Sequence, residues 1–200
     1  MGSDLLTTWQ DSFLEVVQES ATAALLKNAS LERNLSDWTT HSTTAVVESC
    51  RAIGWQAAGR GHRLDVLPQA GQEYLAIDVM AFANGDEATS NPARWPLPVA
   101  VFELENSPKD ERVAYSLWKV LCVQADLRLV LAYRDDWDQA RELIGALSTD
   151  VVGGFTPHQR AELRGQTAVV TGSRGQGETF PYGYFKFWRL DANLGRFERL

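Results

Sequence analysis

Residues 99–133 read VAVFELENSPKDERVAYSLWKVLCVQADLRLVLAY, and this stretch decides the fold class. Its two ends are short runs of apolar residues, which predict strands over 99–105 and 127–133. The Asn-Ser-Pro sequence at 106–108 predicts the start of a helix that continues to about residue 125. The second strand is so strongly apolar that we expect it to be buried on both faces of a sheet.

Two helices are predicted before this stretch. Apolar residues such as Leu5 and Trp9 recur at helical spacing over residues 4–27. A second helix follows Ser36, a residue type that often caps a helix N-terminus, and Gly54 ends this helix. We therefore expect one long helix at the start of the chain and a second helix before the sheet.

The period of the sequence changes after the second helix. Residues 55–67 look extended, and 68–71 predict a turn. Residues 73–82, EYLAIDVMAF, predict a strand that is dense in apolar residues and carries one acid. The three prolines and the turn-forming residues of 83–98 predict a long loop.

The C-terminal third predicts a helix over 135–147 and strands over 167–171 and 184–190, with a glycine-rich loop between the strands. The order of elements is therefore helix, strand, strand, strand, helix, strand, with additions at both ends. This order predicts a mixed α/β sandwich and not the regular alternation of a doubly wound sheet. We expect a single domain over residues 1–200, with its core over about 36–133.

Composition excludes several classes of protein. Apolar residues make up 44% of the 200 residues and charged residues 22%, as in a globular domain large enough to bury its own core. No apolar run reaches the length of about 18 residues that a membrane span needs, and the first residues lack the features of a secretory signal. Cys50 and Cys122 cannot form a disulfide framework, so we expect reduced core thiols and a cytoplasmic protein.

The net charge of −7, from 19 basic and 26 acidic side chains, argues against a protein that coats nucleic acid by bulk attraction. The charge is uneven, because residues 1–159 carry 12 basic and 22 acidic side chains and residues 160–200 carry 7 basic and 4 acidic. Chance clustering on a solvated surface is the favoured explanation. The alternative is a C-terminal segment that faces a polyanion.

Three acids in apolar strands form the candidate site. Asp78 lies within 73–82, and because side chains alternate across a strand, Glu103 and Glu105 share one face of 99–105. An ionised carboxylate in such a strand is costly unless a partner offsets its charge. If the two strands are neighbours, a shared proton or a hard cation such as Mg²⁺ would relieve the repulsion between Asp78 and Glu103. A lone acid would mark the solvent face of a sheet, whereas three acids followed by a helix with a lysine favour a site.

These residues resemble the PD-(D/E)XK nuclease family. The core order of that family is helix, three strands, helix, strand, which is the order predicted here over about residues 36–133. The family motif places an Asp on the second strand, which Asp78 matches, and (D/E)-x-K on the third. Glu103-Leu104-Glu105 matches this second part, with Glu105 where the lysine usually stands.

Two further residues are similar to variants of that pattern. Some members carry the lysine on the helix after the third strand, and Lys119 matches that variant. Lys109, at the start of the same helix, is the second candidate. The plain alternatives are an exposed lysine on an amphipathic helix for Lys119 and a solvated first-turn residue for Lys109. Glu48, on the first core helix, matches an acid that some members add as a further metal ligand.

The resemblance implies a restriction-endonuclease-like three-layer α/β sandwich, with a central mixed sheet flanked by helices. It also implies a metal-dependent nuclease whose substrate is nucleic acid, with DNA the first choice. Asp78 and Glu103 would hold Mg²⁺ or Mn²⁺, with the Leu104 carbonyl as a backbone ligand. The metal would lower the pKa of a bound water and offset charge on the phosphate. Lys119 would orient that water or stabilise the transition state, and Glu105 would hold a second metal or a water.

Two other functions stay open. Without a cation near Glu105, the loss of the strand lysine would leave an inactive nuclease-fold module that binds nucleic acid or a protein partner. The other is a structural, partner-dependent subunit with some of the seven tryptophans at an interface, although Trp38, Trp118 and Trp137 are more simply core residues. A small nuclease that cuts both strands would also fit a homodimer.

Overall fold

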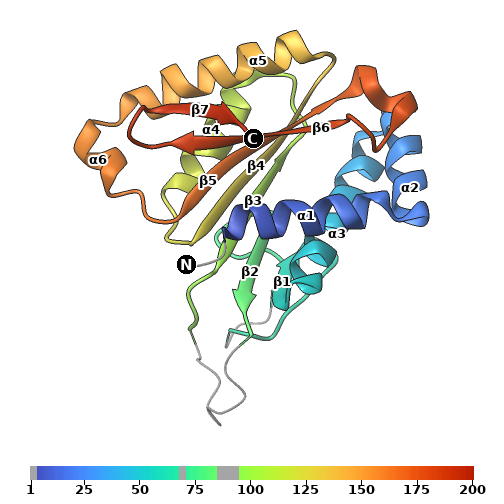
Figure 1. Cartoon of the computed structure of the whole chain (residues 1–200). Helices are drawn as coiled ribbons and strands as arrows, with labels where there is room; N and C mark the ends of the chain where they lie inside the picture. Colours follow the sequence, from blue (N-terminus) through green and yellow to red (C-terminus); the bar gives the residue numbers. More distant parts are fainter. Residues whose placement is uncertain (1–3, 68–70, 85–94) are drawn as a thin grey trace.

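The structure is a computed structural model of the chain, and it describes residues 4–67, 71–84 and 95–200. Within these ranges a mixed seven-stranded sheet forms the centre, and its strands follow their order along the chain (Figure 1). Strands β3, β4 and β5 run parallel, and the other neighbouring pairs are antiparallel. The bounds are Trp55–Gly59 (β1), Val79–Ala83 (β2), Ala100–Glu105 (β3), Leu127–Arg134 (β4), Gln166–Ser173 (β5), Phe185–Asp191 (β6) and Arg196–Arg199 (β7). The mixed α/β class predicted from the sequence is confirmed.

Helices lie against both faces of this sheet. One cluster of buried apolar side chains joins the sheet to α1, α2 and α3, and a second joins its other face to α4 and α5. The helix bounds are Leu5–Gln18 (α1), Ser20–Leu31 (α2), Leu35–Ala52 (α3), Asp110–Leu121 (α4), Trp137–Ala146 (α5) and Pro157–Ala161 (α6), with short turns at Leu147–Val151 (η1), Val152–Gly154 (η2) and Arg174–Thr179 (η3). Among the described helices, none has the length and apolar character that crossing a membrane requires.

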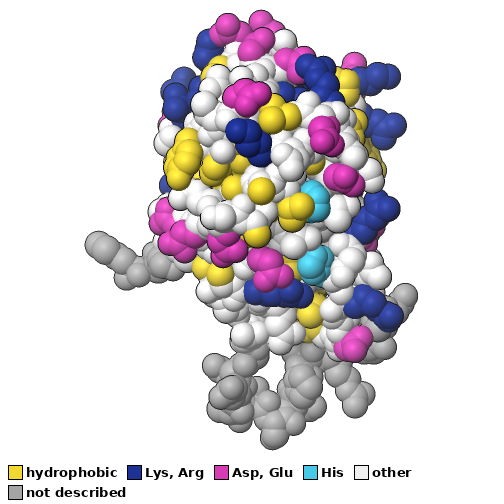
Figure 2. Space-filling view, turned by 90° about the vertical axis from the view of Figure 1, so that its right-hand side faces the viewer, with side chains coloured by type: hydrophobic (Ala, Val, Ile, Leu, Met, Phe, Trp, Pro, Cys, Tyr) yellow, Lys and Arg dark blue, Asp and Glu magenta, His cyan; other side chains and the backbone are white. Residues whose placement is uncertain are grey.

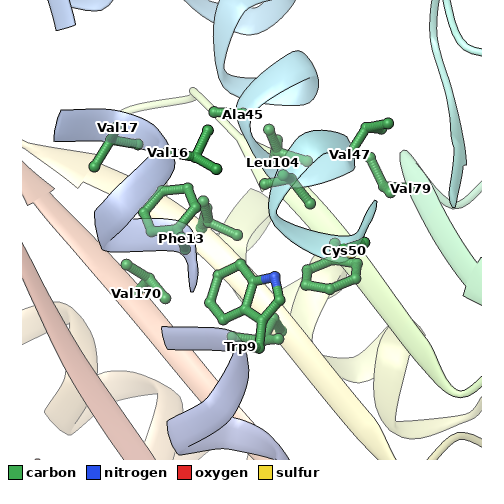
Figure 3. Close-up of a cluster of buried hydrophobic side chains, with 14 of the residues drawn as sticks. Trp9, Phe13, Val16, Val17, Ala45, Val47, Cys50, Val79, Leu104 and Val170 are labelled. Atoms are coloured by element: carbon green, nitrogen blue, oxygen red, sulfur yellow. The ribbon is translucent and has the colours of Figure 1, made fainter. Parts of the chain in front are cut away.

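The first cluster is built around aromatic side chains of α1. Trp9 and Phe13 stack with ring centroids 5.0 Å apart, and Trp9 also meets Phe102 of β3 at 5.2 Å. Figure 3 shows Trp9 and Phe13 in one cluster with Cys50 of α3 and Val170 of β5. Each fully buried side chain of this kind stabilises the fold by about 1.5–3 kcal/mol. The cluster therefore fixes α1 and α3 side by side on the sheet.

The single helix predicted over 4–27 is wrong, because the chain forms two helices. Glu19 separates α1 from α2 with an extended backbone (φ −57°, ψ 131°). After the break α2 takes a new direction (Figure 1), and Leu26 of α2 joins the same buried cluster as Trp9 of α1. The cap of the next helix is also Asn34 and not Ser36, since the Asn34 side chain accepts a hydrogen bond from the Asp37 N–H.

The strand predicted over 73–82 is shorter than expected. Only its second half forms β2, and the extended segment over 55–67 is reduced to β1. Leu75 and Ala76 have φ values of +55° and +54°, which a strand cannot contain. They form a turn closed by a bridge between Tyr74 and Ile77. Asp78 therefore lies directly before β2, and the prediction that it lies within a strand is wrong.

The predicted strands at 99–105 and 127–133 are confirmed as β3 and β4, with the helix between them as α4. Strand β5 is longer than predicted, and β6 is shifted by one residue from the predicted strand. Both continue the same sheet, and a further strand, β7, pairs with β6. The glycine-rich segment between β5 and β6 contains η3. Residues 68–70 of the predicted turn and 85–94 of the predicted loop lie outside the described residues.

The cysteines and tryptophans divide between core and surface. Cys50 is buried, as predicted, but Cys122 is exposed just after α4. Trp38 is buried and Trp137 is half-buried, whereas 49% of Trp118 is exposed. The prediction of a core position is therefore wrong for both Cys122 and Trp118, because Trp118 lies on the outward side of α4 and Cys122 is exposed after its last turn.

Candidate active site

Asp78 lies where the antiparallel pairing of β2 with β3 begins. Val79 pairs with Phe102, so Asp78 comes opposite Glu103. The Asp78 Oδ2 accepts a hydrogen bond from the Leu104 N–H at 2.7 Å. The Asp78 N–H donates to Glu103 Oε1 at 3.3 Å. Both the backbone and the side chain of Asp78 are thus tied to β3, and this holds two of the predicted acids together.

Glu103 is a buried acid in the middle of β3, with only 4% of its surface exposed. Its neighbours Phe102 and Leu104 belong to the cluster under α1 and α3, so alternation turns Glu103 to the other face, toward α4. The Glu103 Oε2 accepts a hydrogen bond from the Ser116 hydroxyl at 3.3 Å. An ionised group at this depth requires a partner for its charge.

Lys119 of α4 provides that partner. Its Nζ lies 2.7 Å from Glu103 Oε2 and donates to the Ala76 carbonyl at 2.8 Å. Ala76 belongs to the turn before Asp78, so Lys119 connects α4 both to β3 and to the segment that carries Asp78. Three of the residues predicted from the sequence, Asp78, Glu103 and Lys119, therefore meet in one place.

Burial raises the pKa of both carboxyl groups at this site. For Asp78 the loss of water is the largest cause of the raised pKa, and the hydrogen bond from Leu104 and the charge of Lys119 oppose it. For Glu103 burial is again the largest cause, Lys119 opposes it, and the charge of Asp78 adds to it. A second cation near the pair would therefore favour the state in which both acids are ionised.

Glu105 and Leu104 complete the β3 side of the site. Glu105 lies on the same face as Glu103, and its Oε1 accepts a hydrogen bond from the Ser107 N–H at 2.8 Å. The charge of Glu105 is one of the causes that raise the pKa of Asp78. The N–H and the C=O of one strand residue point to the same side, so the Leu104 carbonyl faces the side on which its N–H meets Asp78.

Glu48 and Lys109 lie apart from this group. Glu48 is half exposed on α3, and its Oε1 accepts a hydrogen bond from Arg51 Nη1 at 2.7 Å. Lys109 is exposed at the N-cap of α4, and its N–H donates to the Ser107 hydroxyl. In the part of the chain that the structure describes, neither side chain contacts Asp78 or Glu103.

Two groups at the site were not predicted from the sequence. Ser116 bonds to Glu103, and its only signal is a position three residues before Lys119 on the same helix. The Ala76 carbonyl, which accepts from Lys119, gives no signal, because a strand was predicted where the chain makes a turn.

The oxygen donors at this site are few but suited to hard cations. Over the described ranges, no group of three or more His, Cys, Asp or Glu side chains is placed to hold a metal ion. Asp78 and Glu103, with the nearby Leu104 carbonyl, offer the carboxylate and carbonyl oxygens that Mg²⁺ prefers, and water completes such a shell. An ammonium beside two acids can also stabilise negative charge on a phosphate.

Comparison with known proteins adds no relative. No family model, no curated protein and no solved structure matches the chain. Any function proposed for it must therefore rest on the geometry of its own residues.

Proposed function

We propose that this protein is a Mg²⁺- or Mn²⁺-dependent nuclease that hydrolyses phosphodiester bonds, with DNA as the substrate to test first. The observation that carries the proposal is the convergence of Asp78, Glu103 and Lys119, with Lys119 Nζ 2.7 Å from Glu103 Oε2. These residues come from three different elements, so the sequence spacing alone does not bring them together. They occupy the positions at which the resemblance to PD-(D/E)XK nucleases places the site.

The order of the elements supports the same proposal. The chain runs through α3, β1, β2, β3, α4 and β4, which is the order helix, three strands, helix, strand. Helices against both faces of the sheet agree with a restriction-endonuclease-like three-layer sandwich (Figure 1). The site lies at the N-terminal end of β2 and the C-terminal half of β3, where the pairing of these two strands ends.

In the proposed site, Asp78 and Glu103 would hold the divalent cation together with the Leu104 carbonyl. The bound cation would lower the pKa of a water and offset charge on the phosphate. The raised pKa values of the two acids agree with this role, since a cation replaces the proton that the crowded pair favours. Glu105 would hold a second metal or a water, and Glu48, which pairs with Arg51 of its own helix, is left out of the set.

Lys119 would replace the motif lysine, at whose position on β3 this chain has Glu105. Its ammonium already lies between β3 and the turn before β2, and 22% of its side chain is exposed. A phosphate that entered from solvent could therefore reach it. Lys119 would orient the attacking water or stabilise the charge that develops on the phosphate.

A cleavage assay tests this proposal. The wild-type protein is expected to cut DNA in Mg²⁺ or Mn²⁺, and Asp78→Ala or Glu103→Ala to abolish cleavage. Lys119→Ala should lower the rate by about 10²–10³-fold, the cost of losing one group that stabilises the transition state. Glu48→Gln is the matched control, because it removes the charge of an acid on α3 that does not contact the site. Unchanged cleavage by both Asp78→Ala and Glu103→Ala would remove the proposal.

A second candidate is a binding module that keeps the fold without the chemistry. It is favoured by the ion pair itself, because Lys119 neutralises Glu103 without a metal. Acidic and basic side chains are interspersed on the face shown in Figure 2, which does not form one basic surface over its described part. This candidate predicts no heat of Mg²⁺ or Mn²⁺ binding in a calorimetric titration, whereas a saturable site would exclude it.

A further inference from the structure

Two aromatic side chains on the outward side of α4 are exposed to solvent. Tyr115 is 58% exposed and Trp118 is 49% exposed. Their ring centroids are 6.0 Å apart, with 33° between the ring planes. Large aromatic rings are costly to leave in water, so neighbouring exposed rings of this kind often mark a binding surface.

The aromatic pair lies beside the candidate active site. Trp118 directly precedes Lys119, and Tyr115 lies one helical turn before Lys119 on the same side of α4. The inner side of α4, which includes Val113, Leu117 and Val120, packs in the core and fixes this orientation. Because Lys119 is bonded to Glu103, the rings and the candidate site share one stretch of α4.

The rings are set among charges and not within a broad apolar area. Glu111 and Arg112 are both exposed one turn before Tyr115, and Lys119 is one turn after it. A stable protein interface buries about 1,200–2,000 Å² around an apolar centre. Two isolated rings do not supply such an area, and with Lys119 of the candidate site beside them they are better matched to a polyanion that carries flat, apolar groups.

We propose that Tyr115 and Trp118 form a stacking platform for unpaired nucleobases, and that the protein prefers single-stranded nucleic acid. This inference rests on the proposed function, since it places a phosphate of the same strand at Asp78 and Glu103. Aromatic side chains stack on the faces of free bases, and Arg112 and Lys119 attract the backbone phosphates. In a duplex the base faces are covered by their neighbours, so the platform discriminates against paired DNA.

Binding without divalent cations tests the platform separately from catalysis. Fluorescence anisotropy in EDTA would compare a labelled 12-nucleotide oligothymidine with an abasic strand of the same length and with a duplex. Replacing both rings, as Tyr115→Ala with Trp118→Ala, should weaken binding of the oligothymidine by about 5- to 150-fold per stacked base. The same double variant should leave affinity for the abasic strand and the duplex unchanged, and Tyr115→Phe should keep wild-type affinity.

Tyr182→Ala is the matched control, because Tyr182 is an aromatic residue that is 72% exposed outside α4. Unchanged oligothymidine binding by the double variant, or an equal loss on the abasic strand, would overturn the proposal. A wild-type protein that instead self-associates through Tyr115 and Trp118 would also overturn it. If binding depends on the rings but no strand is ever cut, the platform stands and the proposed catalysis fails.

Discussion

Replacing Lys119 with methionine tests the ion pair on which the candidate site depends. Methionine keeps the length and the apolar stem of the side chain but removes its charge. The change leaves Glu103, which is 4% exposed, without its cation and the Ala76 carbonyl without its donor. We expect Lys119→Met to destabilise the protein in the absence of divalent cations.

The magnitude follows from the burial of the two partners. Removing one member of a fully buried ion pair lowers the free energy of unfolding by about 3–5 kcal/mol, because the remaining charge stays buried without a partner. Lys119 keeps 22% exposure, so water can reach the gap, and about 2–4 kcal/mol is expected here. Glu103→Gln removes the charge instead, so adding Lys119→Met to Glu103→Gln should cost only about 1 kcal/mol more, the value of one hydrogen bond.

Urea denaturation of the two single variants and the double variant forms a double-mutant cycle that measures this coupling. The loss caused by Lys119→Met should also shrink as the pH falls. Without Lys119, burial raises the pKa of Glu103 in the folded state above its unfolded value, so the variant is stable below the unfolded pKa and loses stability as pH rises through the folded pKa. Additive effects of the two substitutions, or a loss that does not depend on pH, would refute the reasoning.

Two further changes have expected outcomes. Asp78→Asn should raise the melting temperature at pH 7 without divalent cations, because burial raises the pKa of Asp78 and its ionised form opposes folding. The gain, about 2–4 °C per kcal/mol in a domain of this size, should disappear below the ordinary pKa of an aspartate, and calorimetry at pH 7 and pH 3 checks both parts. Gly172→Ala should destabilise β5 by about 1–3 kcal/mol through overpacking, since a Cβ there would lie 2.6 Å from the Tyr133 ring and 2.8 Å from the Tyr184 ring. Denaturation midpoints measure this loss, and a neutral Gly172→Ala would show that the two rings can move aside.

The elements that the sequence predicted best are those whose local pattern and burial agree. Apart from Arg128 and Arg134, strand β4 is apolar, and it is buried on both faces, so its pattern predicts only a strand. Helix α3 ends as predicted, because Gly54 adopts φ +83°, a conformation that other residues rarely take. In both elements the local sequence pattern was enough to predict the structure.

The errors arise where distant contacts decide the structure. The helix predicted over 4–27 breaks at Glu19, and the second half, α2, packs against α3 and η3. The turn at Leu75 and Ala76 interrupts an apolar run that looks like a strand. Trp118 was predicted in the core because it is apolar, but the buried side of α4 is already filled by Val113, Leu117 and Val120.

The candidate site was predicted in part because strand register is periodic. Alternation along β3 separates Glu103 from Phe102 and Leu104, and this is visible in the sequence. That Lys119 reaches Glu103, and that Glu48 pairs with Arg51 instead, depends on the orientations of α4 and α3. Helix orientation is set by packing, which no local pattern encodes.

The most direct test of the account is a crystal structure of the protein soaked in Mn²⁺, with the metal located by its anomalous scattering. The account predicts a Mn²⁺ ion bound by carboxylate oxygens of both Asp78 and Glu103, and a parallel crystal of Asp78→Asn in which the ion is lost. Mn²⁺ bound only elsewhere, or the Lys119–Glu103 pair intact in saturating Mn²⁺ with no ion between the acids, would contradict it.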